Sequence, residues 1–194
     1  MAYPTVSAPY GLKPVNRVDG MAYAGATRQI PISSGQSAAV FFGDVVKIDT
    51  DGYLVKDTGT TAATPCGVFV GCQYVNSMGQ TVQAQYMPAG MTGAIAYVVD
   101  DPMAAFKVAV VSGTTVIAGV GRTVVGSNMA LVQNAGNTAT GDSAVAVLST
   151  SADVTATLPV RVIDVVKETA TGADSYVELI VKINTHQYNN TTGV

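Results

Sequence analysis

The sequence has few charged residues and no tryptophan. Asp, Glu, Lys and Arg make up 12% of its 194 residues, about half of the roughly 25% found in globular domains. Ten basic residues against 13 acidic ones give a formal net charge of -3. Nucleic acids and anionic lipids are bound by a surplus of basic residues, so we expect neither nucleic acid nor a membrane as a partner. Hydrophobic residues reach 48%, which suggests that other protein covers part of the exterior.

Long apolar runs and a leader sequence are also missing. Apolar runs such as AIAYVV at 94–99 are much shorter than the roughly 20 residues of a membrane-spanning helix. The opening MAYPTVSAPYGLKP has no basic stretch followed by an apolar one. We therefore expect no signal peptide, and a protein that stays in the cytoplasm where it is made.

Residues for catalysis or metal binding are scarce. His186 is the only histidine and lies in a polar C-terminal segment, where we expect it to be solvated or to contact a partner. A Ser/His/Asp hydrolase would need it as the base, yet no G-x-S-x-G motif occurs. Cys66 and Cys72 are spaced wrongly for a Cys-x-x-Cys pair, and on an extended strand their Cα atoms would lie ~20 Å apart, too far for a disulfide. We predict two buried free thiols, no enzymatic activity, no cofactor and no metal.

Three other motifs fit structural roles better than functional ones. DTDG at 49–52 opens like a calcium loop, but no Glu stands at its twelfth position, where a bidentate ligand is needed. GVGR at 119–122 lacks the spacing of a dinucleotide-binding loop. Asp100 and Asp101 are adjacent, and neighbours on a strand point to opposite faces, so they do not suggest a glycosidase pair.

What the sequence does contain is β-strand character. No long window repeats apolar residues at helical spacing, whereas β-branched and aromatic runs recur between Gly, Asp, Asn and Ser. We predict an all-β fold, either a β-sandwich, a barrel or a more open tulip-like domain, with short connecting helices. The expected strands are 39–48, 53–56, 67–75, 81–86, 94–99, 106–111, 130–133, 144–149, 160–167 and 176–183.

Local signals predict two strand pairs and one short helix. Asp51-Gly52 separates two β-rich segments and suits the type I′ turn of a hairpin. The segments VRVIDVVKE and SYVELIVKI predict a second antiparallel pair with a longer connection. Asp101 as N-cap and Pro102 as first helical residue predict a helix of one or two turns over MAAF.

Residues 1–25 differ from the rest. Three prolines and three glycines disfavour helices and central strands, so we predict an extended N-terminal arm followed by a β-rich domain over 26–194. A mobile tail is the alternative reading, and a division of the β-rich part into two subdomains near 100–112 stays open. The side chains expected to anchor the arm on a neighbouring surface are Tyr3, Tyr10, Leu12, Val15, Met21 and Tyr23.

A succession of segments carries a family resemblance. These are SAPYGLKPVNRVDGMAYAGATRQIPI, FFGDVVKIDTDGYLVKD, TPCGVFVGCQYV, AYVVDDPMAAFKV, NTATGDSAVAVL, LPVRVIDVVKE and YVELIVKINTHQY. In this order, and over nearly the whole chain, they resemble a family of virion structural proteins of tailed phages that infect marine and freshwater bacteria. The middle third also resembles the small β-rich decoration proteins of phage capsids.

The resemblance implies a capsid cement, or decoration, protein on the outer surface of the virion. Such a protein binds the expanded capsid lattice at junctions between capsomers and stabilises it against the pressure of packaged DNA. Its partners would be the major capsid protein and further copies of itself, as a homotrimer. Another virion part, in the tail, the head-tail junction or a head-fibre base, is the alternative. A glycan-binding or glycan-cleaving module is a third reading, which the absence of Trp and the 7% aromatic content disfavour.

Overall fold

The computed structural model describes residues 9–169, 176–190 and 193. In this part of the chain, every regular element longer than three residues is a strand, and the three 3-10 helices have three residues each. The elements are β1 (Lys13–Arg17), β2 (Arg28–Pro31), β3 (Val45–Ile48), β4 (Leu54–Lys56), β5 (Gly67–Val75), β6 (Thr81–Ala84), β7 (Ile95–Val99), β8 (Ala104–Val111), η1 (Arg122–Val124), β9 (Asn128–Met129), β10 (Leu131–Val132), β11 (Ala146–Leu148), η2 (Ser149–Ser151), β12 (Val160–Val165), β13 (Glu178–Ile183) and η3 (Gln187–Asn189).

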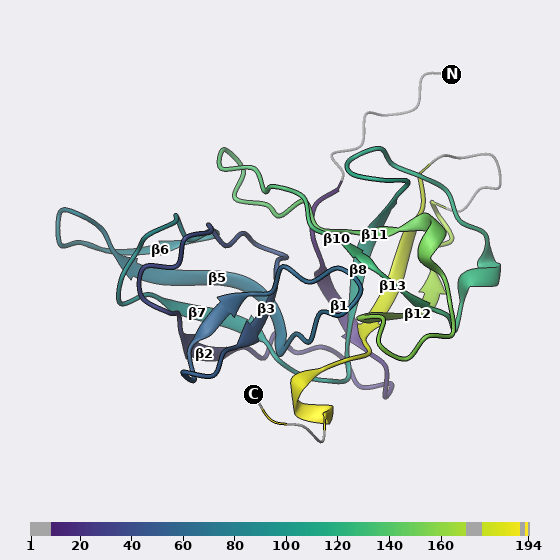
Figure 1. Ribbon diagram of the computed structural model, residues 1–194, viewed down its shortest axis with the longest axis horizontal. Coiled ribbons are helices and arrows are strands. Elements are labelled where there is room, and N and C mark those ends of the chain that lie inside the picture. The colour runs from purple at the N-terminus through teal and green to yellow at the C-terminus, as the bar shows by residue number, and fades with distance from the viewer. Residues whose placement is uncertain (1–8, 170–175, 191–192, 194) are drawn as a thin grey trace.

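One sheet is nearly closed into a barrel. Its strands follow the order β10-β11-β8-β13-β12-β9, and β1 adds to β8. Only Ala130 separates β9 from β10, so one stretch of chain supplies both ends of this order. Ala130 also accepts a hydrogen bond from the Leu148 amide, at 3.0 Å. The barrel-like sheet forms the right half of the molecule in Figure 1.

The central strand of the barrel-like sheet is β8. In its sequence AAFKVAVV, every residue except Lys107 is buried, which is typical of a strand covered on both faces. One edge of β8 pairs with β13, and the other pairs first with β1 and then, in parallel, with β11. Three strands from distant parts of the sequence are therefore aligned on β8.

The second sheet has six strands and projects from the barrel. Its order is β2-β7-β5-β3-β4, with β6 paired to the outer part of β5. The start of β5 pairs with β3 and its end with β6. The β5–β6 hairpin therefore extends beyond the rest of the sheet and lies far from the barrel, at the left in Figure 1.

The two sheets have separate apolar cores that adjoin each other. One core fills the barrel and includes Phe106, Met129 and Leu179, and the other lies against the second sheet around Phe69 and Met87. The barrel core also takes in residues from the near ends of β3, β5 and β7, namely Val45, Val68 and Val99. The chain passes from the second sheet to the barrel at residues 100–103, between β7 and β8.

The all-β prediction is confirmed, and each of the ten predicted strand ranges overlaps a strand. The hairpin at Asp51-Gly52 and the antiparallel pair β12–β13 are also present. The type I′ turn is wrong, because it requires positive φ at both central residues. Gly52 has φ 77°, but no described residue other than glycine has a positive φ. The Gly52 amide donates to Asp49 O at 2.8 Å, which gives a three-residue loop instead.

The predicted helix over MAAF is also wrong. Asp101 does cap a turn, since its side chain accepts from the Met103 amide at 2.8 Å and its carbonyl from the Ala104 amide at 3.0 Å. Strand β8 begins directly after this turn, at Ala104. Pairing with β1 and β13 on both sides offers these residues more hydrogen bonds and burial than one helical turn would.

The extended arm needs correction where it meets the barrel. Residues 13–17 form β1, which pairs with β8 despite Pro14, because an edge strand tolerates proline. Leu12 is 0% exposed in the barrel core. Gly11, with φ 79°, passes so close to Ser143 that an added Cβ would lie 2.7 Å from the serine Cβ. This part of the predicted arm thus belongs to the folded body.

Replacing Leu12 by Ala tests that placement. Because Leu12 is fully buried, we expect the change to lower the free energy of unfolding by about 2–5 kcal/mol. Val15 on the same segment is 43% exposed, so Val15→Ala should change it by no more than about 0.5 kcal/mol. Urea unfolding followed by circular dichroism measures both. Equal small losses would show that the segment does not pack on the barrel.

Candidate functional site

The residues predicted to anchor the chain on a partner have different environments. Tyr3 lies outside the described residues. Leu12 is not available to a partner, because it is fully buried in the chain's own core. Tyr23 is half-buried and packs against the barrel core, and burial raises the pKa of its hydroxyl. Val15 and Met21 are 43% and 64% exposed, so their predicted contact with a partner stays a prediction.

Tyr10 belongs to a polar cluster within the chain. Its hydroxyl and that of Tyr176 both donate to Glu178 on β13. Lys107 Nζ lies 3.3 Å from the same carboxylate, and Lys13 Nζ lies 5.0 Å from the centre of the Tyr10 ring. Burial, with the Glu178 charge, raises the pKa of both tyrosines. Burial alone would raise the pKa of Glu178, but the two hydroxyls and Lys107 outweigh it, so this pKa is lowered. Tyr10 therefore fastens the N-terminal segment to the barrel.

Exposed apolar side chains gather on the N-terminal segment. Val15 lies in β1, while Val18 and Met21 lie in the loop that follows, and all three are exposed. The neighbouring Arg17 forms ion pairs with Asp19 and Asp101, both at 2.6 Å. The arginine charge is therefore taken up within the chain, and the three apolar side chains are the exposed hydrophobic groups of this segment. We call Val15, Val18 and Met21 the N-terminal apolar patch.

A buried ion pair within the second sheet is linked to the barrel through Ser143, which precedes β11. Asp44 is 0% exposed and its carboxylate lies 2.8 Å from Lys56 Nζ. The same carboxylate accepts hydrogen bonds from the Ser143 hydroxyl at 2.6 Å and from the Phe41 amide at 2.9 Å. Ser143 in turn accepts from the Val145 amide at 3.0 Å. These contacts connect the segment before β3 with β4 and with the segment before β11.

A second polar cluster surrounds the connection between the sheets. Asp100 pairs with Arg28 of β2 at 2.9 Å and accepts from the Tyr188 hydroxyl at 3.2 Å. Arg28 also donates to that hydroxyl. These contacts hold the C-terminal helix η3 beside β2 and the end of β7. Asp100 and Asp101 thus each have an arginine partner, which gives both a structural role.

His186 lies under this cluster and is 0% exposed. The expectation of a solvated or partner-contacting histidine is wrong, because η3 folds back onto the start of β5, where the Gln187 amide donates to Pro65 O at 3.0 Å. His186 Nδ1 accepts from the Tyr188 amide at 3.2 Å, which places the proton of the neutral ring on Nε2. Burial lowers the pKa of His186, and the nearby charges of Asp100 and Asp101 oppose this only in part.

Both cysteines are buried and free, as predicted. Cys66 precedes β5 and Cys72 lies within it. Burial raises the pKa of the Cys66 thiol to about 12 and that of Cys72 to about 11. Thiolates are the reactive form of cysteine, so these two residues act as small apolar side chains.

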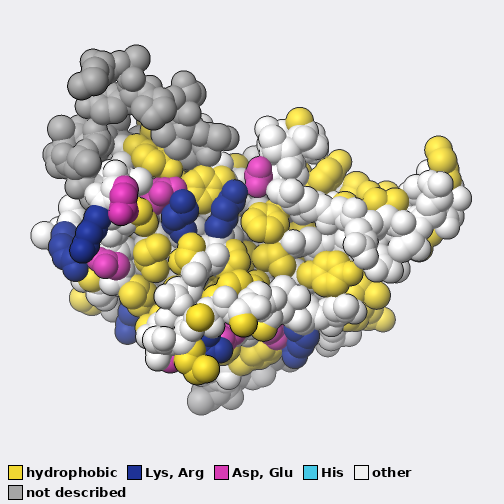
Figure 2. All heavy atoms as spheres, turned by 180° about the vertical axis from the view of Figure 1, so that it is seen from behind, with side chains coloured by type: hydrophobic (Ala, Val, Ile, Leu, Met, Phe, Trp, Pro, Cys, Tyr) yellow, Lys and Arg dark blue, Asp and Glu magenta, His cyan; other side chains and the backbone are white. Residues whose placement is uncertain are grey.

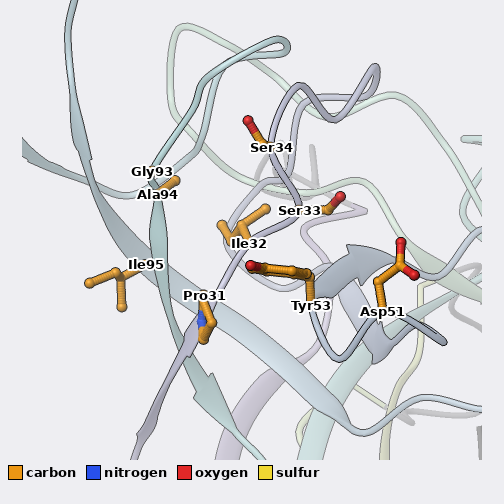
Figure 3. Close-up of a pocket in the computed structure, with 9 residues that line it drawn as sticks. All are labelled: Pro31, Ile32, Ser33, Ser34, Asp51, Tyr53, Gly93, Ala94 and Ile95. Carbon is orange, nitrogen blue, oxygen red and sulfur yellow. The ribbon is translucent and has the colours of Figure 1, made fainter.

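An open cavity of about 410 Å³ lies where β2, β7 and the β3–β4 turn meet. Figure 3 shows the Tyr53 side chain extending from the turn toward Ile32. The hydroxyls of Ser33 and Ser34 and the Asp51 carboxylate are spread around the cavity and are not turned toward one another (Figure 3). These three groups therefore do not form the contacting nucleophile and base of covalent catalysis.

The strongest surface feature is a long uncharged segment. Residues 58–99 contain no Asp, Glu, Lys or Arg, and they form β5, β6 and β7 with their loops. Figure 2 shows the projecting end of the second sheet in white and yellow, with the charged side chains over the rest of that face. Val75 and Met78, at the end of the β5–β6 hairpin, are 49% and 82% exposed. The absence of charge in 58–99 can be seen in the sequence, but only the structure shows that this segment forms the projecting end of the second sheet.

Other kinds of site receive no support. In the described ranges, no three His, Cys, Asp or Glu residues come together as a metal site would require. Within the same ranges, no helix has the length and apolar character to cross a membrane. Comparisons of the chain with protein families, curated proteins and solved structures found no match.

Breaking the buried ion pair should destabilise the fold. Lys56→Met leaves the Asp44 carboxylate buried without its cation, and we expect a loss of about 3–5 kcal/mol in the free energy of unfolding. Lys47 lies on the neighbouring strand and has no ion pair among the described residues. Lys47→Met is therefore the control, with a change within about 0.5 kcal/mol. Similar urea midpoints for the two variants would contradict a stabilising role for the pair.

Because of His186, the free energy of unfolding should decrease as the pH is lowered. The unfolded chain takes up a proton at His186 near pH 6.5, whereas the folded chain does so only at a lower pH because its pKa is lowered. The histidine's contribution to stability is thus present above pH 6.5 and is lost as pH falls toward the folded pKa. Asn at this N-cap also accepts an amide hydrogen bond but does not titrate. Between pH 7.5 and 5, urea unfolding should show a larger loss for the wild type than for His186→Asn. Parallel profiles would contradict a buried neutral histidine.

Proposed function

We propose that this chain is a capsid cement protein of a tailed phage. It binds the outside of the expanded capsid lattice at junctions between capsomers and works as a homotrimer. The major capsid protein is its partner, and it needs no substrate or cofactor. The resemblance of its segments to virion structural proteins motivates this proposal, and the surface of the folded chain supports it.

The observation that carries the proposal is the uncharged segment 58–99 of the projecting sheet. A free protein keeps itself soluble with charged surface residues and rarely leaves a long segment without them. Here 42 consecutive residues, 58–99, carry no charge, and exposed apolar side chains mark the end of the projection. Such a surface suits a protein that works covered by its neighbours, as a lattice component does.

The N-terminal apolar patch supplies the capsid-binding face in this proposal. Val15, Val18 and Met21 are exposed, while the residues next to them are fixed by β1 and by the Arg17 ion pairs. The patch is thus held on a rigid support, which lowers the entropy that binding would cost.

Stabilisation of the lattice follows from mass action. A protein that binds only the assembled, expanded lattice lowers its free energy by RT ln(1 + [L]/Kd) at each site, about 2.7 kcal/mol at a hundredfold excess over Kd. Repeated at every junction, this contribution opposes disruption of the shell by internal pressure. The chain itself needs only a rigid fold and a complementary face.

Replacing Met21 by Glu tests the proposed face. The new carboxylate would be buried without a partner against the capsid, so we expect binding to expanded, empty capsids to weaken by about tenfold or more. Val154, which is 91% exposed in the loop before β12, provides the control Val154→Glu, which should bind like the wild type. Co-sedimentation with capsids and the capsid melting temperature measure binding and protection.

Two results would contradict the proposal. If the wild-type chain neither co-sediments with expanded capsids nor raises their melting temperature, it is not a cement protein. If Val154→Glu is impaired and Met21→Glu is not, the capsid-binding face lies elsewhere on the molecule. Circular dichroism of both variants shows whether either has lost the fold.

A further inference from the structure

β6 leaves one edge of the projecting sheet unpaired. It pairs with β5 through four residues, Thr81 to Ala84, and no other described strand pairs with it. The Asn76 amide donates to Gln80 O at 2.9 Å, and bonded pairs alternate along an antiparallel ladder. The next bonded pair is therefore Tyr74 with Val82. It follows that Thr81 and Gln83 direct their backbone N–H and C=O groups away from β5.

This edge lacks the features that usually prevent edge-to-edge pairing. Proteins protect such edges with charged side chains, proline, bulges or a covering segment. In the same sheet, the outer strand β2 carries Arg28 and Pro31. The other outer strand, β4, carries Lys56, and Leu54 is bridged by Ile32. The sequence of β6 is TVQA, with neither a charge nor a proline.

The edge is complementary to itself. Two copies related by a twofold axis through Val82 would place Thr81 of one copy opposite Gln83 of the other. Both residues would then exchange N–H and C=O bonds, which gives four backbone hydrogen bonds across the axis. Two identical surfaces normally bring like charges together, but the segment 58–99 has none to repel. No charged group would have to lose its hydration, so charge favours a second copy as the occupant.

We propose that β6 pairs antiparallel with β6 of a second copy of this chain, with Val82 on the twofold axis. The contact continues the second sheet from one copy into the next. This goes beyond the proposed function, because it requires no capsid and concerns a different surface from the N-terminal apolar patch. A four-residue contact binds weakly in solution. On a capsid lattice, the high local concentration of copies would strengthen this contact, and only that strengthening depends on the proposed function.

Cysteine cross-linking of the isolated chain tests both the contact and its register. Two Val82 residues facing each other in a non-bonded pair would have Cα atoms about 4.5 Å apart, within the range that a disulfide spans. We expect Val82→Cys to form a disulfide-linked dimer in a glutathione redox buffer. The native thiols do not compete, because Cys66 and Cys72 are buried.

Thr81→Cys is the matched control. Two residues at position 81 are diagonal neighbours in this register, about 7–8 Å apart, which is beyond ready disulfide formation. Thr81 is more exposed than Val82, so random collisions would cross-link Thr81→Cys more readily than Val82→Cys. The proposal therefore requires the opposite order, with dimer from Val82→Cys and little from Thr81→Cys.

A second measurement does not depend on introduced thiols. Gln83→Lys places like charges on the two edges, so it should abolish dimers seen by sedimentation velocity at high protein concentration. Gln29→Lys, on the exposed β2 edge of the same sheet, should leave them unchanged. Folding of each variant is checked by circular dichroism.

Three outcomes would overturn the proposal. The first is a Val82→Cys chain that stays monomeric at every concentration. The second is equal cross-linking of the two cysteine variants, which would indicate random contact. The third is Val82→Cys that cross-links to the major capsid protein on particles but never to itself, which would make a capsid strand the occupant of the edge. Because the capsid-binding test uses Met21 and this one uses the free chain, either proposal can fail without the other.

Discussion

A shortage of charge is the constraint on which the rest of the structure depends. Within residues 9–169 and 176–190, six of the ten basic residues form ion pairs with acidic residues, and several of these pairs lie at joints between elements. Arg17 and Arg28 hold the connection at Asp100–Asp101, and Lys56 neutralises the buried Asp44. Most of these paired side chains are still partly exposed, but none of the charged residues falls in the segment 58–99, which forms β5, β6 and β7.

The contacts between these elements hold two surfaces on one folded body, namely the N-terminal apolar patch and the β6 edge. β8 aligns β1, β11 and β13, and therefore fixes the segment that carries the N-terminal apolar patch. The polar cluster around Asp100 attaches the C-terminal helix η3 to the second sheet. Val15 of the patch lies in the barrel-like sheet and β6 in the second sheet, so the two proposed contacts use different surfaces.

Most of the strands could be predicted from the sequence, because β-branched runs between turn residues are a local signal. β1 and β2 were missed because Pro14, Pro31 and the surrounding glycines hide edge strands, whose pairing depends on a distant partner. The burial of His186 could not be read locally either, since it depends on η3 folding onto a segment more than a hundred residues away. The uncharged segment 58–99 is visible in the sequence, but its position on an unpaired edge is a property of the sheet order.

The central claim is that this chain covers a capsid lattice throughout. Its copy number relative to the major capsid protein, measured by quantitative mass spectrometry of purified virions, tests that claim most directly. A lattice-wide cement protein must be present in a fixed ratio to the capsomers, at a level comparable with the major capsid protein itself. A handful of copies per virion would indicate a tail or junction component instead, and absence from the virion would contradict the account.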